Sequence, residues 1–391
     1  MKTTLALAAS VLALAFATTA SANSEHVVRI SGVGAQKFAV RINVGNQAFS
    51  RCLAKNLELS GLFQVSPNGQ ISVTGVPGAI RAEGLGKNVP CMESFADDKS
   101  ARMAARRLSD SMVAAFSNGA QKGFACDKVL FLNRGRQQAK GASVPSEMCV
   151  AYPDGFDIRQ LTSDSKMTIF PRWHGSDKII YISDRNGAPQ VWEMDLAANQ
   201  RKVKWSLKGT PAGIAVSPDG TKIAAILSFH GNPELYVISG DRFTRLTNTP
   251  LASEGQPTWS PDGKKIAYVS NETRHPQIYV IDVATKAKRR LTSIGRENVD
   301  PDWGKDGRIA YITKRNGSQV AVMNPAEGDS TSKVLTEPAN WEHPSWSRDA
   351  RHLAANRDRA VFSIDTLEGG DKPKSIFLSN GANFTSPCWM K

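Results

Sequence analysis

A repeat with a period of about 43 residues is the feature of this sequence that most limits its fold. The best-preserved unit, Pro257–Ser270, places a Ser-Pro-Asp-Gly turn between two strand-forming segments, a pattern that predicts a β-hairpin. Related segments end 43 or 44 residues apart, too regular a spacing to arise by chance. Such a period is typical of four-stranded propeller blades. The repeat anchors are Trp173, Val216, Trp259, Trp303, Trp346 and Trp389.

Three further strands can be found in each unit. Second strands are predicted from residues 178, 222, 265, 308 and 351, and third strands from 190, 234, 277, 319 and 361. An upstream unit starting at Lys128 lacks its first strand, whereas Thr385–Met390 is a first strand without partners. We therefore predict an all-β six-bladed β-propeller in which the C-terminal strand closes blade one, so that no sheet edge stays open.

The first 22 residues have the features of a secretory signal peptide. Lys2 precedes the apolar run Leu5–Ala17, and Ala20-Ser-Ala22 matches the small-residue cleavage pattern. The alternative, a membrane anchor, is disfavoured because the apolar run is short for a bilayer span. We expect the mature chain to be exported.

Residues 23–123 predict a small α/β domain, and residues 124–391 the propeller. Helices are expected over Gln47–Leu59 and Lys99–Ser117, the second with apolar residues at helical spacing and Asp98 as its cap. Strands are expected at 26–30, 37–44, 70–74, 79–83 and 89–95. No glycine-rich phosphate loop or other cofactor signature is found, so we predict no cofactor.

Five cysteines in an exported chain indicate disulfides with one thiol left over. A bond between Cys126 and Cys388 would staple the closing blade, with Cys149 as a competing partner. The other candidate cysteines, Cys52 and Cys91, fall in the N-terminal domain. Neither Cys-x-x-Cys nor His-x-x-x-His spacing occurs, so no metal site is expected.

Charge and motifs favour a binding protein over an enzyme. The formal net charge is +13, which suits attraction to anionic membrane surfaces or acidic proteins, or serves only solubility. Nucleic acid is not an expected partner of an exported protein. There is no Gly-x-Ser-x-Gly nucleophile motif, and the six histidines are dispersed, as surface residues usually are. We predict no catalytic residues.

Function is therefore expected on the loops of one propeller face. In each blade, the loop that leads into the first strand (the leading loop) and the loop joining strands two and three emerge at the same end. Trp341 stands out there as an aromatic outside the repeat series, and we interpret it as exposed. The candidate residues of the leading loops are Gly213, Glu254, Gly255, Gln256, Asp300, Trp341, Glu342 and His343.

The order of these parts resembles the TolB family of the Tol-Pal envelope system. A signal peptide, a small α/β domain and six repeats of the Trp-Ser-Pro-Asp-Gly type are followed by a terminal Pro-x-Trp strand. The resemblance covers nearly the whole mature chain and is strongest at Ala151–Phe156, Trp259–Gly263 and Ser386–Trp389.

The resemblance implies a periplasmic, monomeric, non-enzymatic adaptor that maintains outer-membrane integrity, with a role in cell division. It implies that a Pal-like peptidoglycan-associated lipoprotein binds the leading-loop face. It also implies that the mature N-terminus contacts a TolA-like inner-membrane protein. The residues of that N-terminal segment are Glu25, His26, Val27, Val28 and Arg29.

Two other functional classes are weighed against the adaptor. A propeller of the prolyl oligopeptidase kind would need an α/β-hydrolase domain, and its nucleophile motif does not occur. An exported glycan- or ligand-binding propeller would carry one exposed aromatic residue at equivalent loop positions of every blade. Trp341 has no counterpart in the other leading loops, which disfavours a lectin-like site.

Overall fold

Two kinds of β-sheet make up this protein in the computed structural model, which describes residues 37–135, 144–205, 210–229, 231–367, 372–377 and 382–390. One is a five-stranded sheet with two helices, and the other is a four-stranded antiparallel sheet that occurs six times. Residues 1–22, expected to be a signal peptide, and the segment 25–29 lie outside the described residues. Neither described helix is long and apolar enough to cross a bilayer.

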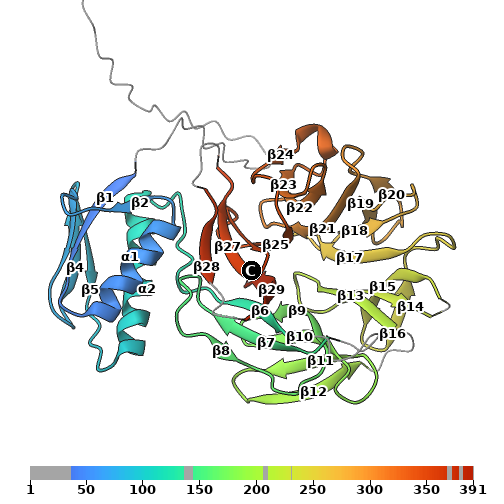
Figure 1. Ribbon diagram of the computed structural model, residues 1–391, viewed down its shortest axis with the longest axis horizontal. Helices are drawn as coiled ribbons and strands as arrows, with labels where there is room; N and C mark the ends of the chain where they lie inside the picture. Colours follow the sequence, from blue (N-terminus) through green and yellow to red (C-terminus); the bar gives the residue numbers. More distant parts are fainter. Residues whose placement is uncertain are drawn as a thin grey trace, which may run out of the picture. The chain divides into compact units, whose positions relative to one another are not determined.

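The five-stranded sheet has the order β2-β1-β3-β4-β5, with β1 parallel to both of its neighbours. Its remaining pairs are antiparallel. The strands alternate buried and exposed side chains, because one face packs against the helices (Figure 1). The strands are β1 (Phe38–Asn43), β2 (Phe63–Val65), β3 (Ile71–Thr74), β4 (Ile80–Gly84) and β5 (Lys87–Cys91).

Both predicted helices are present, α1 at Gln47–Leu59 and α2 at Asp98–Phe116. Asn46 caps α1 by accepting a hydrogen bond from the Phe49 amide at 2.9 Å. The cap of α2 is Asp97 and not Asp98 as predicted. Asp97 forms a capping box with Ser100, and Asp98 falls in the first turn, where an acidic residue suits the helix dipole.

The six four-stranded sheets are the blades of a propeller, arranged around a central axis (Figure 1). Five of the six predicted repeat anchors are the last residues of inner strands, and Trp173 is the last residue but one of β9. The second and third strands of the blades are rich in β-branched and aromatic residues, which favour strands. These two strands are almost fully buried. The inner strands are β9 (Thr168–His174), β13 (Thr210–Val216), β17 (Glu254–Trp259), β21 (Glu297–Trp303), β25 (Trp341–Trp346) and β29 (Phe384–Trp389).

The other strands follow outward in each blade, close to the predicted positions. The second strands are β6 (Val129–Arg134), β10 (Lys178–Ser183), β14 (Ile223–Ser228), β18 (Lys265–Ser270), β22 (Ile309–Lys314) and β26 (His352–Arg357). The third strands are β7 (Ser146–Ala151), β11 (Gln190–Asp195), β15 (Pro233–Ser239), β19 (Gln277–Asp282), β23 (Ser318–Met323) and β27 (Ala360–Asp365). The outer strands are β8 (Arg159–Gln160), β12 (Gln200–Trp205), β16 (Arg242–Arg245), β20 (Lys288–Arg290), β24 (Lys333–Val334) and β28 (Lys374–Phe377). A short 3-10 helix, Gly328–Thr331, follows β23.

The C-terminal strand closes the ring as predicted. β29 is the inner strand of the sheet β29-β6-β7-β8 and pairs antiparallel with β6, Trp389 opposite Val129. The Trp389 side chain is fully buried, and its ring meets Phe124 edge-on at a centroid distance of 5.3 Å. Strands from the two ends of the propeller sequence therefore share one sheet.

Three of the tryptophans at the ends of the inner strands donate a hydrogen bond to the preceding blade. The indole N–H of Trp259 donates to the Ala215 carbonyl of the preceding blade at 3.1 Å, and that of Trp346 donates to the Asp302 carbonyl at 3.1 Å. Across the closure, Trp173 donates to the Cys388 carbonyl at 3.1 Å. The repeat therefore sets the contact between blades as well as the strands within them.

All five cysteines are free thiols, so the structure contains none of the disulfides that the sequence suggested. Cys388 packs in the apolar core between the first and second blades. Cys126 lies beside Asp110, and Cys52 donates to the Asp154 carboxylate at 3.2 Å. Cys91 belongs to the core of the five-stranded sheet. Each thiol has its own packing or polar partner.

A buried ion pair joins α2 to the loop between β7 and β8. The Arg106 side chain is fully buried and donates to Asp154 at 2.7 Å and to Asp157 at 2.9 Å. Its guanidinium lies 3.8 Å from the centroid of the Tyr152 ring. Asn56 on α1 donates to the same Asp154 carboxylate at 2.9 Å. The loop Tyr152–Asp157 is thereby fixed to both helices.

We predict that Arg106→Ala lowers the free energy of unfolding by about 3–5 kcal/mol, because it leaves the buried Asp154 charge without its partner. Urea unfolding followed by circular dichroism measures the change. Arg107→Ala is the matched control on the same helix. Its ion pair with Glu93 is exposed, so the expected loss is at most about 1 kcal/mol. Equal losses in the two variants would contradict the structural role of Arg106.

Candidate functional site

Each inner strand of the propeller is interrupted by a β-bulge near its start. In five blades the bulge contains a residue with positive φ directly before a proline. Residues other than glycine seldom adopt this conformation, and they concentrate at functional sites. The five bulge residues are Phe170, Gln256, Asp300, His343 and Ser386.

Three of these bulge residues form a chain of hydrogen bonds from blade to blade. The Gln256 side chain accepts from the Asp300 amide at 3.0 Å, and its own amide group donates to the Asp300 carboxylate. The second Asp300 oxygen accepts from the His343 amide at 3.0 Å. Side chains predicted separately from the sequence thus lie together on three adjacent blades, at the end of the channel that carries the leading loops.

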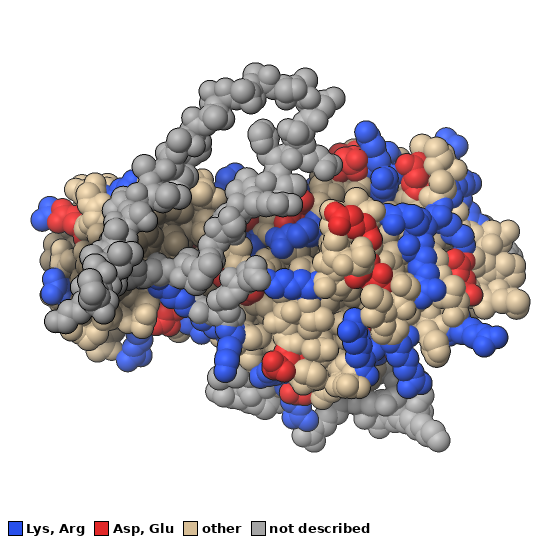
Figure 2. All heavy atoms as spheres, turned by 90° about the horizontal axis from the view of Figure 1, so that it is seen from above, with Lys and Arg blue, Asp and Glu red and all other residues tan. Residues whose placement is uncertain are grey.

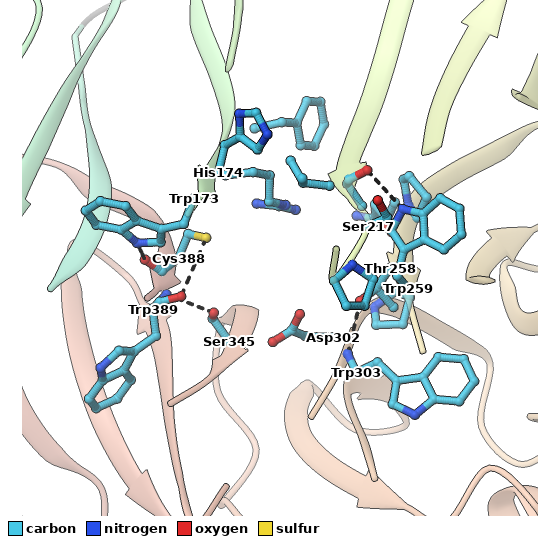
Figure 3. Close-up of a pocket in the computed structure, with 18 of the residues that line it drawn as sticks. Trp173, His174, Ser217, Thr258, Trp259, Asp302, Trp303, Ser345, Cys388 and Trp389 are labelled. Carbon is cyan, nitrogen blue, oxygen red and sulfur yellow. Dashed lines mark hydrogen bonds between the residues drawn. The ribbon is translucent and has the colours of Figure 1, made fainter. Parts of the chain in front are cut away.

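The inner strands enclose a central channel with a volume of about 860 Å³. Polar side chains of its wall bind the next blade: Thr258 accepts from the Trp303 amide, Asp302 from the Trp346 amide and Ser345 from the Trp389 amide. In Figure 3 the Asp302 carboxylate points into the open centre of the channel. In three adjacent blades, a residue of the channel wall therefore joins its blade to the next one.

The charges that line the channel are mixed. Basic side chains come from Arg172, His174, Lys178 and Lys305, and the carboxylates include Asp219, Asp300 and Asp302. Hydrogen bonds from Ser217 and Thr221 hold the pKa of Asp219 at about 2, so it stays ionised. Among the described residues, no group of histidine, cysteine and acidic side chains is placed to hold a metal ion. The channel offers hydrogen-bond donors and acceptors to a polar ligand or a protein segment.

Of the other predicted residues, some lie at this end of the propeller and some do not contribute to its surface. The Glu342 side chain is 57% exposed and accepts from Asn356 at 3.1 Å. Gly255 is half-buried with open space around it, whereas Gly213 is buried against the bulge of the next blade. The loops that join second strands to third strands include His230 and residues 136–143, which lie outside the described residues.

The interpretation of Trp341 as an exposed aromatic residue is wrong. Its side chain is 1% exposed, and its indole N–H donates to the Glu337 carbonyl at 3.1 Å. The ring packs against Phe362 in the core between the last two blades. Trp341 occupies the first inner-strand position of its blade, where the side chain turns away from the channel and into the blade interface.

Glu254 occupies the corresponding position of its own blade and is also buried, with 4% of its surface exposed. One carboxylate oxygen accepts from Thr249 at 2.7 Å and from Ser270 at 3.2 Å. Burial raises the pKa of Glu254 to about 7, and the negative charge of Glu234 adds to the shift. Because its carboxyl group is enclosed, Glu254 cannot present a charge to a partner.

Sequence reasoning missed two groups of residues at this face. The channel-lining Thr258, Asp302 and Ser345 directly precede the anchor tryptophans, and the repeated Pro-x-Trp pattern could have identified them. Leu251 and Ile294 are exposed aliphatic residues of two adjacent leading loops. No repeated pattern identifies these two, because leading loops vary between blades.

The geometry defines the class of protein: a closed six-bladed β-propeller with bulged inner strands and an accompanying small α/β sheet. A family model described as the TolB beta propeller domain matches residues 119–390. This match covers more than half of the chain, which therefore belongs to the TolB beta propeller family.

Individual relatives match over shorter stretches. The Tol-Pal system protein TolB of Anaeromyxobacter sp. (strain K) is 28% identical over 166 residues, which are 42% of this chain and 36% of that protein. The Tol-Pal system protein TolB of Desulfosudis oleivorans is 31% identical over 88 residues, 22% of this chain and 20% of that protein. The chain thus matches about a third or less of the length of these curated relatives.

Solved structures share the fold more completely. The crystal structure of TolB from Acinetobacter baumannii has a TM-score of 0.76 at 21% identity, covering 90% of this chain and 96% of that one. A chain of the nidogen/laminin complex has a TM-score of 0.55 at 13% identity, covering 67% of this chain and 98% of that one. At these identities the likeness concerns the fold.

We predict that Gly213→Ala disturbs the bulged face while Gly255→Ala does not. A Cβ atom at Gly213 would lie 3.0 Å from the Pro257 ring and 3.3 Å from the Gln256 amide, whereas nothing lies within 4 Å at Gly255. The expected loss in the free energy of unfolding is about 1–3 kcal/mol for the first variant and within about 0.5 kcal/mol for the second. Chemical denaturation measures both, and equal values would refute the close packing of the bulges.

Proposed function

We propose that this protein is an exported, non-enzymatic adaptor of a Tol-Pal envelope system. Residues 1–22 are the signal peptide, 23–123 the α/β domain and 124–391 the propeller. The leading-loop end of the propeller binds a Pal-like peptidoglycan-associated lipoprotein, and the segment 25–29 binds a TolA-like inner-membrane protein in the periplasm. The adaptor thereby maintains outer-membrane integrity and supports cell division.

The observation that carries this proposal is the chain of bulges Gln256–Asp300–His343 at the leading-loop end of the channel. Hydrogen bonds hold the Gln256 and Asp300 side chains and the His343 backbone in place before any partner arrives, which lowers the ordering cost of binding. The exposed Glu342 lies directly beside His343 in the sequence. Together with membership of the TolB propeller family, this favours protein binding at this face.

The distribution of charge supports an adaptor as well. Figure 2 shows Lys and Arg side chains gathered in clusters on the face it views, with Asp and Glu between them. Such a surface, with both signs of charge side by side, offers ion-pair partners to another protein. The channel side chains Thr258, Asp302 and Ser345 are engaged with backbone amides of neighbouring blades, which favours a positioning role for them over a catalytic one.

The second candidate, an exported glycan- or ligand-binding propeller, would need exposed aromatic residues for stacking on sugar rings. The aromatic residue that the sequence offered for this purpose, Trp341, is buried. The adaptor is therefore the better supported function.

We predict that Asp300→Asn combined with Glu342→Lys weakens binding of the soluble domain of a peptidoglycan-associated lipoprotein by about tenfold or more. The double variant removes two negative charges from the face and introduces a positive one. Calorimetric titration of the full mature chain measures the affinity, and the wild type should give saturable one-to-one binding.

Asp241→Lys is the matched control, because Asp241 is exposed in the β15–β16 turn at the opposite end of its blade. Its affinity should equal that of the wild type. An unchanged affinity in the double variant would refute the assignment of the face. No binding by the wild-type chain would refute the lipoprotein as partner and favour the glycan-binding alternative.

A further inference from the structure

We propose that Glu254 and Glu234 form a buried proton-binding site between the third and fourth blades, and that one proton held there fixes the leading loop Thr249–Glu254. Glu254 begins β17, and Glu234 lies on β15 of the preceding blade. This inference concerns the propeller alone and holds whether or not the proposed lipoprotein binds.

The two carboxyl groups are brought together by one hydroxyl group. Thr249 donates to Glu254 at 2.7 Å and lies 3.3 Å from the carboxylate of Glu234. Both glutamates are almost fully buried, 4% and 2% exposed. A hydroxyl hydrogen can serve only one acceptor at a time, so it cannot compensate two negative charges. Two ionised carboxylates in this position repel each other.

The basic side chains in this region pair with carboxylates other than Glu254. Arg245 on β16 pairs with Glu234 at 2.8 Å, and Lys288 on β20 pairs with Glu272 in the loop after β18. Among the described residues, no basic side chain forms an ion pair with Glu254. In the part of the chain that the structure describes, the other ionisable groups that face Glu254 are Glu272 and Tyr268, neither of which supplies a positive charge.

One oxygen of Glu254 has no hydrogen-bond partner among the described residues. A buried carboxylate oxygen without a donor is costly when ionised, and protonation removes that cost. The raised pKa of Glu254, about 7, agrees with this geometry. Burial acts on Glu234 as well, but hydrogen bonds from the Thr247 hydroxyl and the Thr249 amide, together with Arg245, lower the pKa of Glu234, so the proton resides on Glu254.

The next pair of blades provides an internal comparison. Asn298 and Gln277 occupy the positions of Glu254 and Glu234, one repeat further along the chain. There the Asn298 amide donates directly to Gln277 at 2.8 Å, and Thr292 donates to the same oxygen at 2.8 Å. The repeat therefore accepts an uncharged, hydrogen-bonded pair at this position. A protonated Glu254 is uncharged, as Asn298 is, and Arg245 balances the charge of Glu234.

The proton controls a loop at the proposed binding face. Besides Thr249, the loop is held by Asn271, whose side chain accepts from the Ser253 amide at 2.7 Å. Its tip carries Leu251, which is fully exposed. When Glu254 ionises, its repulsion from Glu234 opposes the contact through Thr249. We therefore expect the loop to open more often as the pH rises through about 7.

The sign of the effect on stability follows from linkage. Glu254 has a pKa of about 4.5 in the unfolded chain and about 7 in the folded protein. Its proton therefore stabilises the fold fully below pH 4.5, and this stabilisation is lost as the pH rises to about 7. From pH 4 to pH 8 the folding equilibrium constant of the wild type should fall about a hundredfold relative to Glu254→Gln. Denaturant unfolding of the full mature chain at each pH measures this ratio.

Asn298→Asp is the matched variant, because it places a carboxyl group at the equivalent position of the next blade. As the pH rises, the folding equilibrium constant of this variant should fall more than that of the wild type, by about a further hundredfold. Parallel pH profiles for the wild type and Glu254→Gln would overturn the proposal.

A measurement on the wild-type chain covers the case in which Glu254→Gln fails to fold. Hydrogen exchange of residues 246–256, corrected for the intrinsic effect of pH, should show more frequent opening between pH 6 and pH 8. The equivalent loop, residues 291–300, carries Asn298, whose partner Gln277 is also uncharged, and should show no such change. The same pH dependence in both loops would overturn the proposal.

Discussion

The pairing of β29 with β6 is the contact on which the rest of the propeller depends. It joins residues 384–389 to residues 129–134 and turns six separate sheets into a ring without a free inner edge. The buried Trp389 and the Trp173–Cys388 hydrogen bond extend the closure to the neighbouring blades. Every inner strand then lies between two others, so the channel and the bulged face have fixed dimensions.

The bulges show how one repeat can yield both a scaffold and a binding face. Below each bulge, the Pro-x-Trp segment repeats the same contacts between blades. At the bulge itself the residue identity changes from Gln256 to Asp300 to His343, and the side chains of Gln256 and Asp300 each accept a hydrogen bond from the backbone amide of the next bulge. Two residues earlier along each strand, Glu254, Asn298 and Trp341 are all buried in the blade interface. A shift of two residues along the strand therefore separates surface from core.

The sequence predicted the fold well because the repeat places each strand independently several times. The closing strand, the blade count and both helices were correct, while β2 and the cap Asp97 were missed because they rest on short local signals. The site was harder to predict. Glu254 and Trp341 fall in segments that resemble loops, yet their side chains turn inward, and the direction of a side chain at a bulge depends on strand register.

Hydrogen exchange of the amides in β29 and β6, in the full mature chain under native conditions, tests the closed ring most directly. The account predicts that both strands exchange only through global unfolding, with the same opening free energy as β18 or β22. Exchange of β29 through a local opening of much lower free energy, while the other blades stay protected, would contradict the claim that this pairing holds the propeller together.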